Sequence, residues 1–515
     1  MTFQKKIFYQ IFGATILFLP LVANAEGTDA NSKNLEASIN KINAQINNQQ
    51  KTIAKLKSEL HQLKTAQQDK NTIVKAKMQK DAQIKNASPN PILSEGATPV
   101  ITAPYLGVAP RWDAADLIVN QPNYQEDILL MQRDNRFDKE LSNRGLYSNL
   151  NPILEISGKV EGQAYDTKPF NGSSSNNINI SGAELDFVTH VSKWVNGMIS
   201  MNYDKSAPNS NGGQTNAQLT SNSRVYVSQA FATIGNLSLS PFYSTLGYRT
   251  LPYGEYNTSM ISDTYPKMMF RINDPSLLLG YYPKIGEHGF YFNAFTLKGD
   301  TGVNQTPSRL NNGGADAGYL IDNNGFKGDV GISAIANVAD SNGMQANGLS
   351  GSTEFQGFGY APVGANEAAE ILHKRVPGLN AHISLSKNDY TIIAEGNTAT
   401  TEFNPSDLAF NNHGAKPAAA HIEGVYSFNI HNIPSSFALG YDHTWQALAL
   451  AIPEQRYIAT WNISYFKNTI TALEFKREIN YKNAGNNGTA SGQGLNVVIP
   501  GHYANTLTAQ FGYYF

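Results

Sequence analysis

The sequence predicts an α-helical coiled coil followed by an all-β antiparallel barrel, and three observations support this fold class. Apolar residues recur with a seven-residue period over residues 35–63. Beyond about residue 150 the period changes to two, and apolar and polar residues alternate in many short segments. The last of these segments continues this alternation up to Phe515. A period of seven is typical of coiled coils, and a period of two is typical of strands with one apolar face.

Composition and charge exclude several functional classes. The chain of 515 residues is longer than one ordinary domain, so at least two regions are expected. Its 39 basic and 41 acidic residues give a formal charge of −2, which removes the overall basic character of a nucleic-acid-binding protein. Cysteine is absent, and this excludes disulfide scaffolds, thiolate metal sites and cysteine nucleophiles.

Residues 1–25 have the pattern of a secretory signal peptide. Lys5 and Lys6 precede an apolar stretch over residues 7–22, and Ala23-Asn24-Ala25 provides small residues for cleavage before Glu26. A retained transmembrane anchor is the alternative. No later segment approaches the roughly 20 apolar residues that a spanning helix requires. We therefore expect an exported chain that is either soluble or a β-barrel.

A coiled coil is predicted within residues 26–88. The spacing of four and three residues assigns these a and d positions: Leu35, Ile39, Ile42, Ile46, Gln49, Ile53, Leu56, Leu60 and Leu63. Isoleucine at both positions favours trimers, and a buried Gln49 would fix the register. An amphipathic helix packed on its own domain is the alternative, but it requires a wider apolar face.

Charge is distributed unevenly between this region and the rest of the mature chain. Residues 26–88 contain eleven lysines and six acidic residues, a balance of +5, whereas residues 89–515 have a balance of −9. Five prolines between Pro89 and Pro110 predict an extended linker over residues 89–150. A short helix within 111–150 is compatible with the sequence, which leaves open whether that segment plugs the barrel.

Period-two alternation over residues 151–515 predicts a barrel rather than a soluble sandwich. The first segment, residues 154–165, carries polar side chains at its odd-numbered positions, and similar alternation recurs at 183–187, 197–204, 379–385, 422–428, 457–465 and 473–475. A sandwich would also alternate. However, the polar face repeatedly combines opposite charges, which a wet barrel interior accommodates. The predicted lumen-facing residues are Glu155, Lys159, Glu161, Glu184, Asp186, Glu474, Lys476 and Glu478.

The C-terminal segment resembles the insertion signal of bacterial outer-membrane barrels. An aromatic residue closes the alternating sequence Gln510-Phe511-Gly512-Tyr513-Tyr514-Phe515, and Phe511, Tyr513 and Phe515 would form the signal. Residues 224–254 are similar to the hairpin that precedes the inward-folded third loop of trimeric porins. Porins with an N-terminal periplasmic coiled coil are also known. This resemblance implies an outer-membrane porin-like barrel, a homotrimer, and contacts with lipid, lipopolysaccharide and the barrel assembly machinery.

Membrane physics supports the same fold without the resemblance. Lipid provides no hydrogen-bond partners for backbone groups, so a chain of strands crosses a bilayer only when it closes on itself. The segments suggest a transmembrane barrel of about 16 strands, with 14 possible, because bacterial barrels favour even numbers. A barrel of about 16 strands leaves an aqueous channel.

The porin resemblance implies that a loop over Pro252–Pro275 folds into the pore. Its charged residues, the candidates for a constriction, are Glu255, Asp263, Lys267, Arg271 and Asp274. Charged clusters set ion preference in pores. Ordinary solvated loop charges are the alternative. The charge of −9 in this part of the chain predicts a mild cation preference.

Catalysis, metal binding and cofactors are not predicted. His190, His382, His421 and His502 lie in strand-like segments without a nucleophile motif such as G-x-S-x-G. His413 and His421 lack the neighbouring ligands of a metal site.

The predicted function is passive diffusion of small hydrophilic solutes or ions through a trimeric porin. The alternative is a structural outer-membrane anchor or surface adhesin, with a lysine-rich periplasmic helix that tethers it to cell-wall material.

Overall fold

The structure is a computed structural model of the chain. It describes residues 100–102, 126–133, 152–170, 172–204, 224–284, 288–303, 310–323, 325–345, 358–362, 368–450, 452–482 and 501–515. The predicted signal peptide, the coiled coil with its heptads over 35–63, and most of the proline-rich linker lie outside the described residues.

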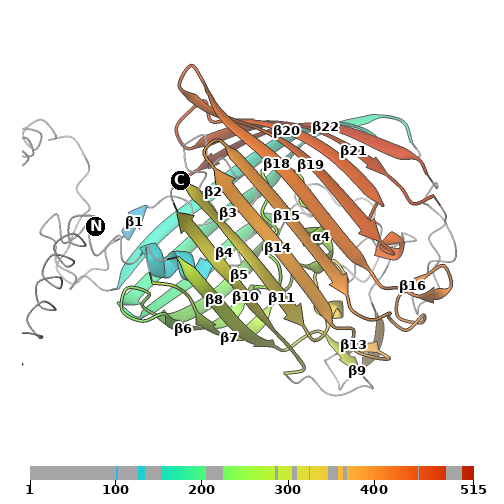
Figure 1. The fold of residues 1–515 in the computed structure, drawn as a ribbon, viewed down its shortest axis with the longest axis horizontal. Coiled ribbons are helices and arrows are strands. Elements are labelled where there is room, and N and C mark those ends of the chain that lie inside the picture. Colours follow the sequence, from blue (N-terminus) through green and yellow to red (C-terminus); the bar gives the residue numbers. More distant parts are fainter. Residues whose placement is uncertain are drawn as a thin grey trace, which may run out of the picture. The chain divides into compact units, whose positions relative to one another are not determined.

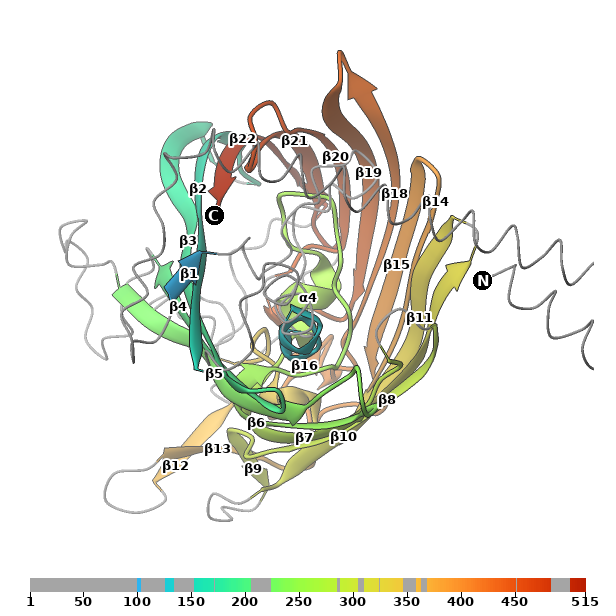
Figure 2. The same cartoon turned by 90° about the vertical axis from the view of Figure 1, so that its left-hand side faces the viewer.

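Sixteen antiparallel strands form one closed barrel (Figures 1 and 2). They are β2 (Ile153–Lys168), β3 (Ser175–Ser192), β4 (Val195–Asp204), β5 (Arg224–Gly235), β6 (Phe242–Thr250), β7 (Asn273–Tyr281), β8 (Gly289–Leu297), β10 (Asn312–Asn323), β11 (Phe326–Ile335), β14 (Gly378–Lys387), β15 (Tyr390–Ala399), β18 (Ala418–Ile430), β19 (Ile433–Trp445), β20 (Gln455–Ile463), β21 (Thr469–Ile479) and β22 (Tyr503–Tyr514). Each pairs with the next, and β2 pairs with β22 from Lys159↔Tyr514 to Lys168↔Asn505. The predicted antiparallel barrel is confirmed, with 16 strands rather than the alternative of 14.

A parallel strand extends the sheet where β22 ends. β1 (Val100–Thr102) pairs with residues 154–156 of β2. Just after these residues, Gly158 and Phe515 exchange two backbone hydrogen bonds, in which each amide donates to the other residue's carbonyl oxygen. Smaller elements belong to the connections: the strands β9 (Thr301–Val303), β12 (Gly359–Pro362), β13 (Ala368–Leu372), β16 (Ala409–Phe410) and β17 (His413–Gly414), the helix α4 (Tyr265–Phe270) and the 3-10 turns η3 (Val338–Asp340) and η4 (Leu448–Leu450).

Large apolar side chains cover the outer face of the barrel. Ile178, Leu246, Phe290 and Ile332 are among many that are mostly exposed, with Phe290 at 73%. The residues that alternate with them face inward and are largely polar, as the burial of Ser157, Asp186 and other strand residues shows. Apolar outside and polar inside is the arrangement of a membrane-spanning barrel. Among the described residues, no helix combines the length and apolar character that crossing a bilayer requires.

The two ends of the barrel differ in their connections. At one end the hairpins are tight: residues 388–389 join β14 to β15, and His431 and Asn432, with φ of 51° and 66°, join β18 to β19. Two central residues with positive φ are typical of the turn that suits a two-residue hairpin. At the other end, residues 251–272, 336–377 and 400–417 form long connections. Membrane barrels place short turns on the periplasmic side and long loops outside.

The hydrophobic core lies inside the barrel. Leu251, Tyr253, Tyr256, Tyr265 and Phe270, all on the connection between β6 and β7, are completely buried in the largest apolar cluster. Figure 2 shows α4 within the ring of strands. The interior is therefore partly filled by protein rather than entirely by water.

Candidate functional site

Residues 251–272 form an inward loop that crosses the barrel interior. The loop leaves β6 at Leu251 and ends before β7, and it contains α4. Thr264 caps α4 because its hydroxyl accepts a hydrogen bond from the Lys267 amide at 3.3 Å, and Pro266 stands in the first turn. The loop therefore places its own small helix in the lumen.

Carboxylates of the barrel wall bind the first half of the inward loop through its backbone. Glu395 on β15 accepts hydrogen bonds from the amides of Glu255 and Tyr256, at 3.0 and 2.5 Å. Glu423 on β18 accepts one from the Ser259 amide at 2.8 Å. Bonds from backbone N–H groups to a carboxylate are stronger than neutral ones, so each wall residue fixes the loop path at one point.

Two further carboxylates bind the tip of the loop and the start of α4. Glu474 on β21 accepts hydrogen bonds from the Ile261 amide at 2.6 Å and from the Ser262 amide and hydroxyl at 3.1 and 2.5 Å. Asp442 on β19 accepts one from the Tyr265 amide at 3.0 Å. The inward loop is thus attached to the wall along most of its length.

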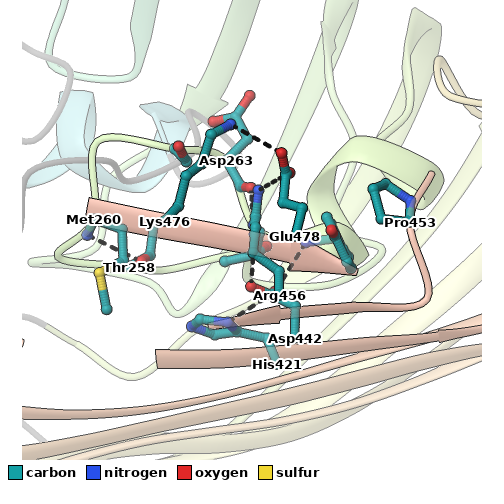
Figure 3. A network of polar contacts seen from close by, with 12 residues as sticks. Thr258, Met260, Asp263, His421, Asp442, Pro453, Arg456, Lys476 and Glu478 are labelled. Carbon is teal, nitrogen blue, oxygen red and sulfur yellow. Dashed lines mark hydrogen bonds and ion pairs between the residues drawn. The ribbon is translucent and has the colours of Figure 1, made fainter. Parts of the chain in front are cut away.

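A row of polar and charged side chains crosses five neighbouring strands behind the loop. Glu395, His421, Asp442, Arg456 and Glu478 stand opposite one another in the register of β15, β18, β19, β20 and β21. The last four are labelled in Figure 3. His421 Nδ1 lies 3.0 Å from Asp442, and Arg456 Nε donates to the same carboxylate at 3.0 Å. Arg456 also lies 4.0 Å from Glu478. Acidic and basic side chains therefore alternate along this part of the wall.

Arg456 connects this row to the loop. Its guanidinium donates to the carbonyl oxygen of Asp263 at the loop tip and lies 4.2 Å from the centre of the Tyr265 ring. Figure 3 shows Arg456 between Asp442, Glu478 and the loop. One buried side chain therefore supports both the tip of the loop and the start of α4.

An open cavity of about 660 Å³ separates the loop tip from the wall formed by β21, β22, β2 and β3. Its lining residues are Lys159, Glu161, Gln163, Tyr165, Thr167, Asn179, Ile180, Ser181, Tyr203, Ile261, Ser262, Asp263, Lys476, Thr506, Thr508 and Gln510. The walls are mostly polar, and the loop contributes three consecutive residues. We call this space the passage.

Of the five predicted constriction residues, only Asp263 lines the passage. Its side chain is 46% exposed and pairs with Lys267 Nζ at 2.7 Å. Lys267 is itself buried on α4, and burial lowers the pKa of its ammonium group, an effect that Asp263 partly offsets. Glu255 is buried between loop and wall, and burial raises the pKa of its carboxyl to about 8.

The other two predicted constriction residues lie at the end of the loop, which is shorter than predicted. The prediction extended it to Pro275, but β7 begins at Asn273, because Asp274 and Pro275 pair with Arg249 and Tyr248 of β6. Asp274 is therefore a strand residue that accepts a hydrogen bond from the Gly299 amide at 2.9 Å. Arg271 is the C-cap of α4.

The predicted lumen-facing residues all lie on the inner side of the barrel. Glu155, Glu184, Asp186 and Glu474 are buried by material inside the lumen. Lys159, Glu161 and Lys476 line the passage, and Glu478 stands in the row behind it. Among the predicted insertion-signal residues, Phe511 and Tyr513 are exposed on the outer face of β22, and the Phe515 backbone bonds Gly158.

A second segment, the helix over 126–133, also lies inside the barrel (Figure 2). Asp127 forms an ion pair with Arg249 of β6, both almost completely buried, and accepts a hydrogen bond from Thr245 at 2.9 Å. Arg133 lies 2.6 Å from Glu155 of β2. The short helix expected within 111–150 is thus held in the lumen by charges at both of its ends.

Glu126 at the start of this lumen helix has an unusual environment. Its side chain is 1% exposed, and neither carboxylate oxygen has a hydrogen-bond partner among the residues that the structure describes. Burial, reinforced by the negative charges of Asp186 and Glu184 and opposed by Arg249, raises the pKa of its carboxyl well above the ordinary value. The protonated form therefore fits this position best.

The wall residues that bind the loop were missed by sequence reasoning. Glu423 occupies a polar position between Ile422 and Gly424 in the alternating segment 422–428. Alternation identifies such residues as inward-facing, but it does not say that Glu395, Glu423 and Asp442 bind a loop from another part of the chain.

The histidines serve as hydrogen-bonding residues of the wall. His190 lies between Glu155 and Asn196 at 3.1 and 3.0 Å, and His382 lies 3.2 Å from the Tyr291 hydroxyl. The prediction that His502 lies in a strand is wrong, because β22 begins one residue later, at Tyr503. Within the described ranges, no group of three or more histidine, cysteine or acidic side chains is arranged to hold a metal ion.

Comparisons with known proteins identify relatives along most of the chain. No family model matches it. It is 32% identical to a UPF0422 protein of Coxiella burnetii over 467 residues, which is 90% of this chain and 93% of the relative. It is 33% identical to the UPF0422 protein lpp3030 of Legionella pneumophila strain Paris over 424 residues, covering 81% and 77% of the two chains.

Solved structures with a similar arrangement were also found. The outer membrane channel DcaP of Acinetobacter baumannii has a TM-score of 0.43 at 15% identity, covering 72% of this chain and 99% of that one. The anion-selective porin from Comamonas acidovorans has a TM-score of 0.45 at 10% identity, covering 71% of this chain and 100% of that one.

Proposed function

This chain belongs to the UPF0422 protein family, and on the basis of its barrel we propose that it is an outer-membrane porin through which small hydrophilic solutes diffuse passively. The observation that carries this proposal is the passage of about 660 Å³ between the loop tip and the wall. Its lining is polar, while the outer face of the barrel is apolar. Water and dissolved solutes are therefore favoured inside, and lipid is favoured outside.

The inward loop supports a role in diffusion rather than a role only in anchoring. A barrel that serves only as an anchor does not require a shaped interior. Here four wall carboxylates, those of Glu395, Glu423, Asp442 and Glu474, fix the backbone of the loop. Fixed walls keep the width of the passage constant, which is what size-limited diffusion requires. We assign the constriction to Asp263 on the loop, facing Lys159, Glu161 and Lys476 on the wall.

The assembly proposed here is a trimer with a periplasmic coiled coil. The heptads over 35–63 favour three helices. The tight hairpins and the start of β2 lie at the same end of the barrel, which suits an N-terminal segment on the periplasmic side. The lysine-rich region would then face cell-wall material, with the barrel inserted by the assembly machinery among lipid and lipopolysaccharide.

Electrical recordings of the purified full-length protein in planar bilayers test this function. We expect discrete conductance steps from protein that shows heat-modifiable migration, the sign of a folded barrel. Replacing Asp263 with Trp would place a bulky side chain in the passage and lower the step size. The matched control is Ser406→Trp, in an exposed loop position, which leaves the steps unchanged.

The alternative function is an anchor or adhesin. Folded protein that inserts into bilayers but produces no steps would favour it. In that case, binding to isolated cell-wall material should require residues 26–88.

A further inference from the structure

We infer that the passage is charge-compensated and that it admits uncharged hydrogen-bonding solutes, such as sugars, more readily than ions. This inference rests on the proposed diffusion function and specifies the class of solute. It depends on two properties of the passage: the pairing of every charged side chain in its lining, and the number of neutral polar side chains there.

Each charged side chain that lines the passage has a partner of opposite sign. Lys159 Nζ lies 3.5 Å from Glu161, and Lys476 Nζ lies 3.6 Å from Glu478. On the loop, Asp263 pairs with Lys267 at 2.7 Å. The six groups comprise three cations and three anions, so an ion in the passage meets small dipoles rather than a field of one sign.

Paired charges compensate poorly for the hydration that an ion loses in a narrow space. Selective channels replace lost water with rings of like charge or with converging dipoles. An anion that Lys159 attracts is repelled by Glu161, which lies 3.5 Å from Lys159, and a cation experiences the reverse. Cations and anions therefore meet similar barriers, and neither is concentrated by the lining.

Neutral hydrogen-bonding groups form most of the remaining lining. They are Gln163, Tyr165, Thr167, Asn179, Ser181, Tyr203, Ser262, Thr506, Thr508 and Gln510. Several form cross-strand pairs: Gln163 donates to Gln510 at 2.6 Å, and the hydroxyls of Thr167 and Thr506 are 2.9 Å apart. Hydroxyl and amide groups both donate and accept, so they can replace the water that a sugar sheds.

The excess of acidic residues in the barrel region is not found in the lining of the passage. Three of the inward-facing carboxylates, Glu395, Glu423 and Glu474, accept hydrogen bonds from the loop backbone and are almost completely buried. None of them lines the passage. In place of the mild cation preference predicted from the charge of −9, we therefore expect near-neutral selectivity in the passage.

The test compares three probes of nearly equal size and different charge. Proteoliposomes containing the full-length protein would be assayed for uptake of labelled glucose, glucosamine, which is cationic, and gluconate, which is anionic. We expect glucose to enter fastest. Reversal potentials in a potassium chloride gradient should give a cation-to-anion permeability ratio within about threefold of unity, because the lining carries no excess charge.

Variants that remove only the positive or only the negative side chains of these pairs should make the passage selective for cations or for anions. Replacing Lys159 and Lys476 with Met leaves acidic partners unopposed and should shift the permeability ratio toward cations by about threefold or more. Glu161→Gln with Asp263→Asn should shift it toward anions. Replacing Lys374 and Lys416 with Met, both in exposed loops outside the lining of the passage, removes the same two charges and should leave the ratio unchanged.

Two kinds of failure can be distinguished. Clear conductance with a permeability ratio beyond about tenfold, or faster entry of either charged probe than of glucose, would overturn the inference and leave the porin function intact. No conductance and no uptake by folded barrels would overturn both.

Discussion

At the scale of single residues, the barrel interior shows how buried carboxylates are stabilised by backbone amides from another part of the chain. Glu474 receives three hydrogen bonds from Ile261 and Ser262, and it also accepts one from Thr460 at 3.0 Å. A buried carboxylate is costly unless it is hydrogen-bonded. The same bonds satisfy loop amides that would otherwise be buried without partners, so wall and loop stabilise each other.

Removing the Glu474 carboxylate should therefore loosen the loop tip. Glu474→Ala removes the carboxylate that accepts from the amides of Ile261 and Ser262, and the loss of each such hydrogen bond costs about 1–3 kcal/mol. We expect noisier single-channel currents and a larger mean conductance, because the tip no longer stays against the wall. Glu402→Ala, in an exposed loop, is the control. Quiet currents of unchanged size in Glu474→Ala would show that this carboxylate does not hold the tip.

Docking of the lumen helix should depend on pH through Glu126. Burial raises the pKa of this carboxyl in the docked state, so the docked helix binds the proton more tightly than the released helix does. Docking is then strongest below the ordinary carboxyl pKa of about 4.3 and weakens above it, by up to about 1.4 kcal/mol per pH unit until the docked-state pKa is reached. Protease accessibility of residues 126–133 should rise with pH.

Replacing the titrating group supplies the control for this pH dependence. Glu126→Gln should flatten the profile, because the amide resembles the protonated acid and does not titrate. Glu402→Gln should leave the profile as it is. A profile that keeps its full slope in Glu126→Gln would assign the dependence to other groups.

At the scale of elements, the inward loop and the lumen helix both enter the barrel, and each is bound to a different part of the wall. The inward loop contacts β15, β18, β19 and β21 through backbone amides. The lumen helix contacts β2 and β6 through side-chain ion pairs and packs Leu130 against Val188, Met198 and Phe231. The passage remains along β21, β22, β2 and β3, between these two attachments.

The Asp127–Arg249 pair should control release of the lumen helix. Arg249→Met leaves the Asp127 carboxylate buried without its cation, a change that typically costs about 3–5 kcal/mol. We expect the helix to become accessible to protease and the conductance to rise. Adding Asp127→Asn to this variant removes the uncompensated charge and should restore much of the docking. Additive effects of the two substitutions would contradict this coupling.

At the scale of the whole molecule, the barrel and the proposed coiled coil have separate tasks. Closure between β2 and β22 makes the barrel complete within one chain. We therefore expect membrane insertion to need no second copy. Self-association is then assigned to the heptads and to contacts between barrels.

Deleting residues 35–63 tests this separation. We expect the variant to insert and to keep heat-modifiable migration, while its oligomer dissociates at lower temperature or lower detergent concentration, because the helix seam is lost. Replacing Gln49 with Ile, which keeps the length of the helix, should instead strengthen association and relax its register. An oligomer of unchanged stability after the deletion would place the association entirely in the barrel.

Sequence alone predicts the barrel, a strand number of 16 or 14, and the side of the sheet on which residues such as Glu155 and Lys476 lie. These properties follow from a two-residue period that any strand at a water–lipid boundary must obey. The porin resemblance predicts the inward loop over Pro252–Pro275. The loop ends three residues earlier, because Asn273–Pro275 belong to β7.

Only the tertiary structure decided which charges meet. It buried Glu255 and Lys267, left Asp263 in the passage, and brought Glu395 and Glu474 to loop amides more than a hundred residues away. It also brought Glu126 within the electrostatic influence of Asp186. Alternation is a local property that reports the side of the sheet, whereas pairing and compensation depend on distances between segments that are joined only when the barrel closes.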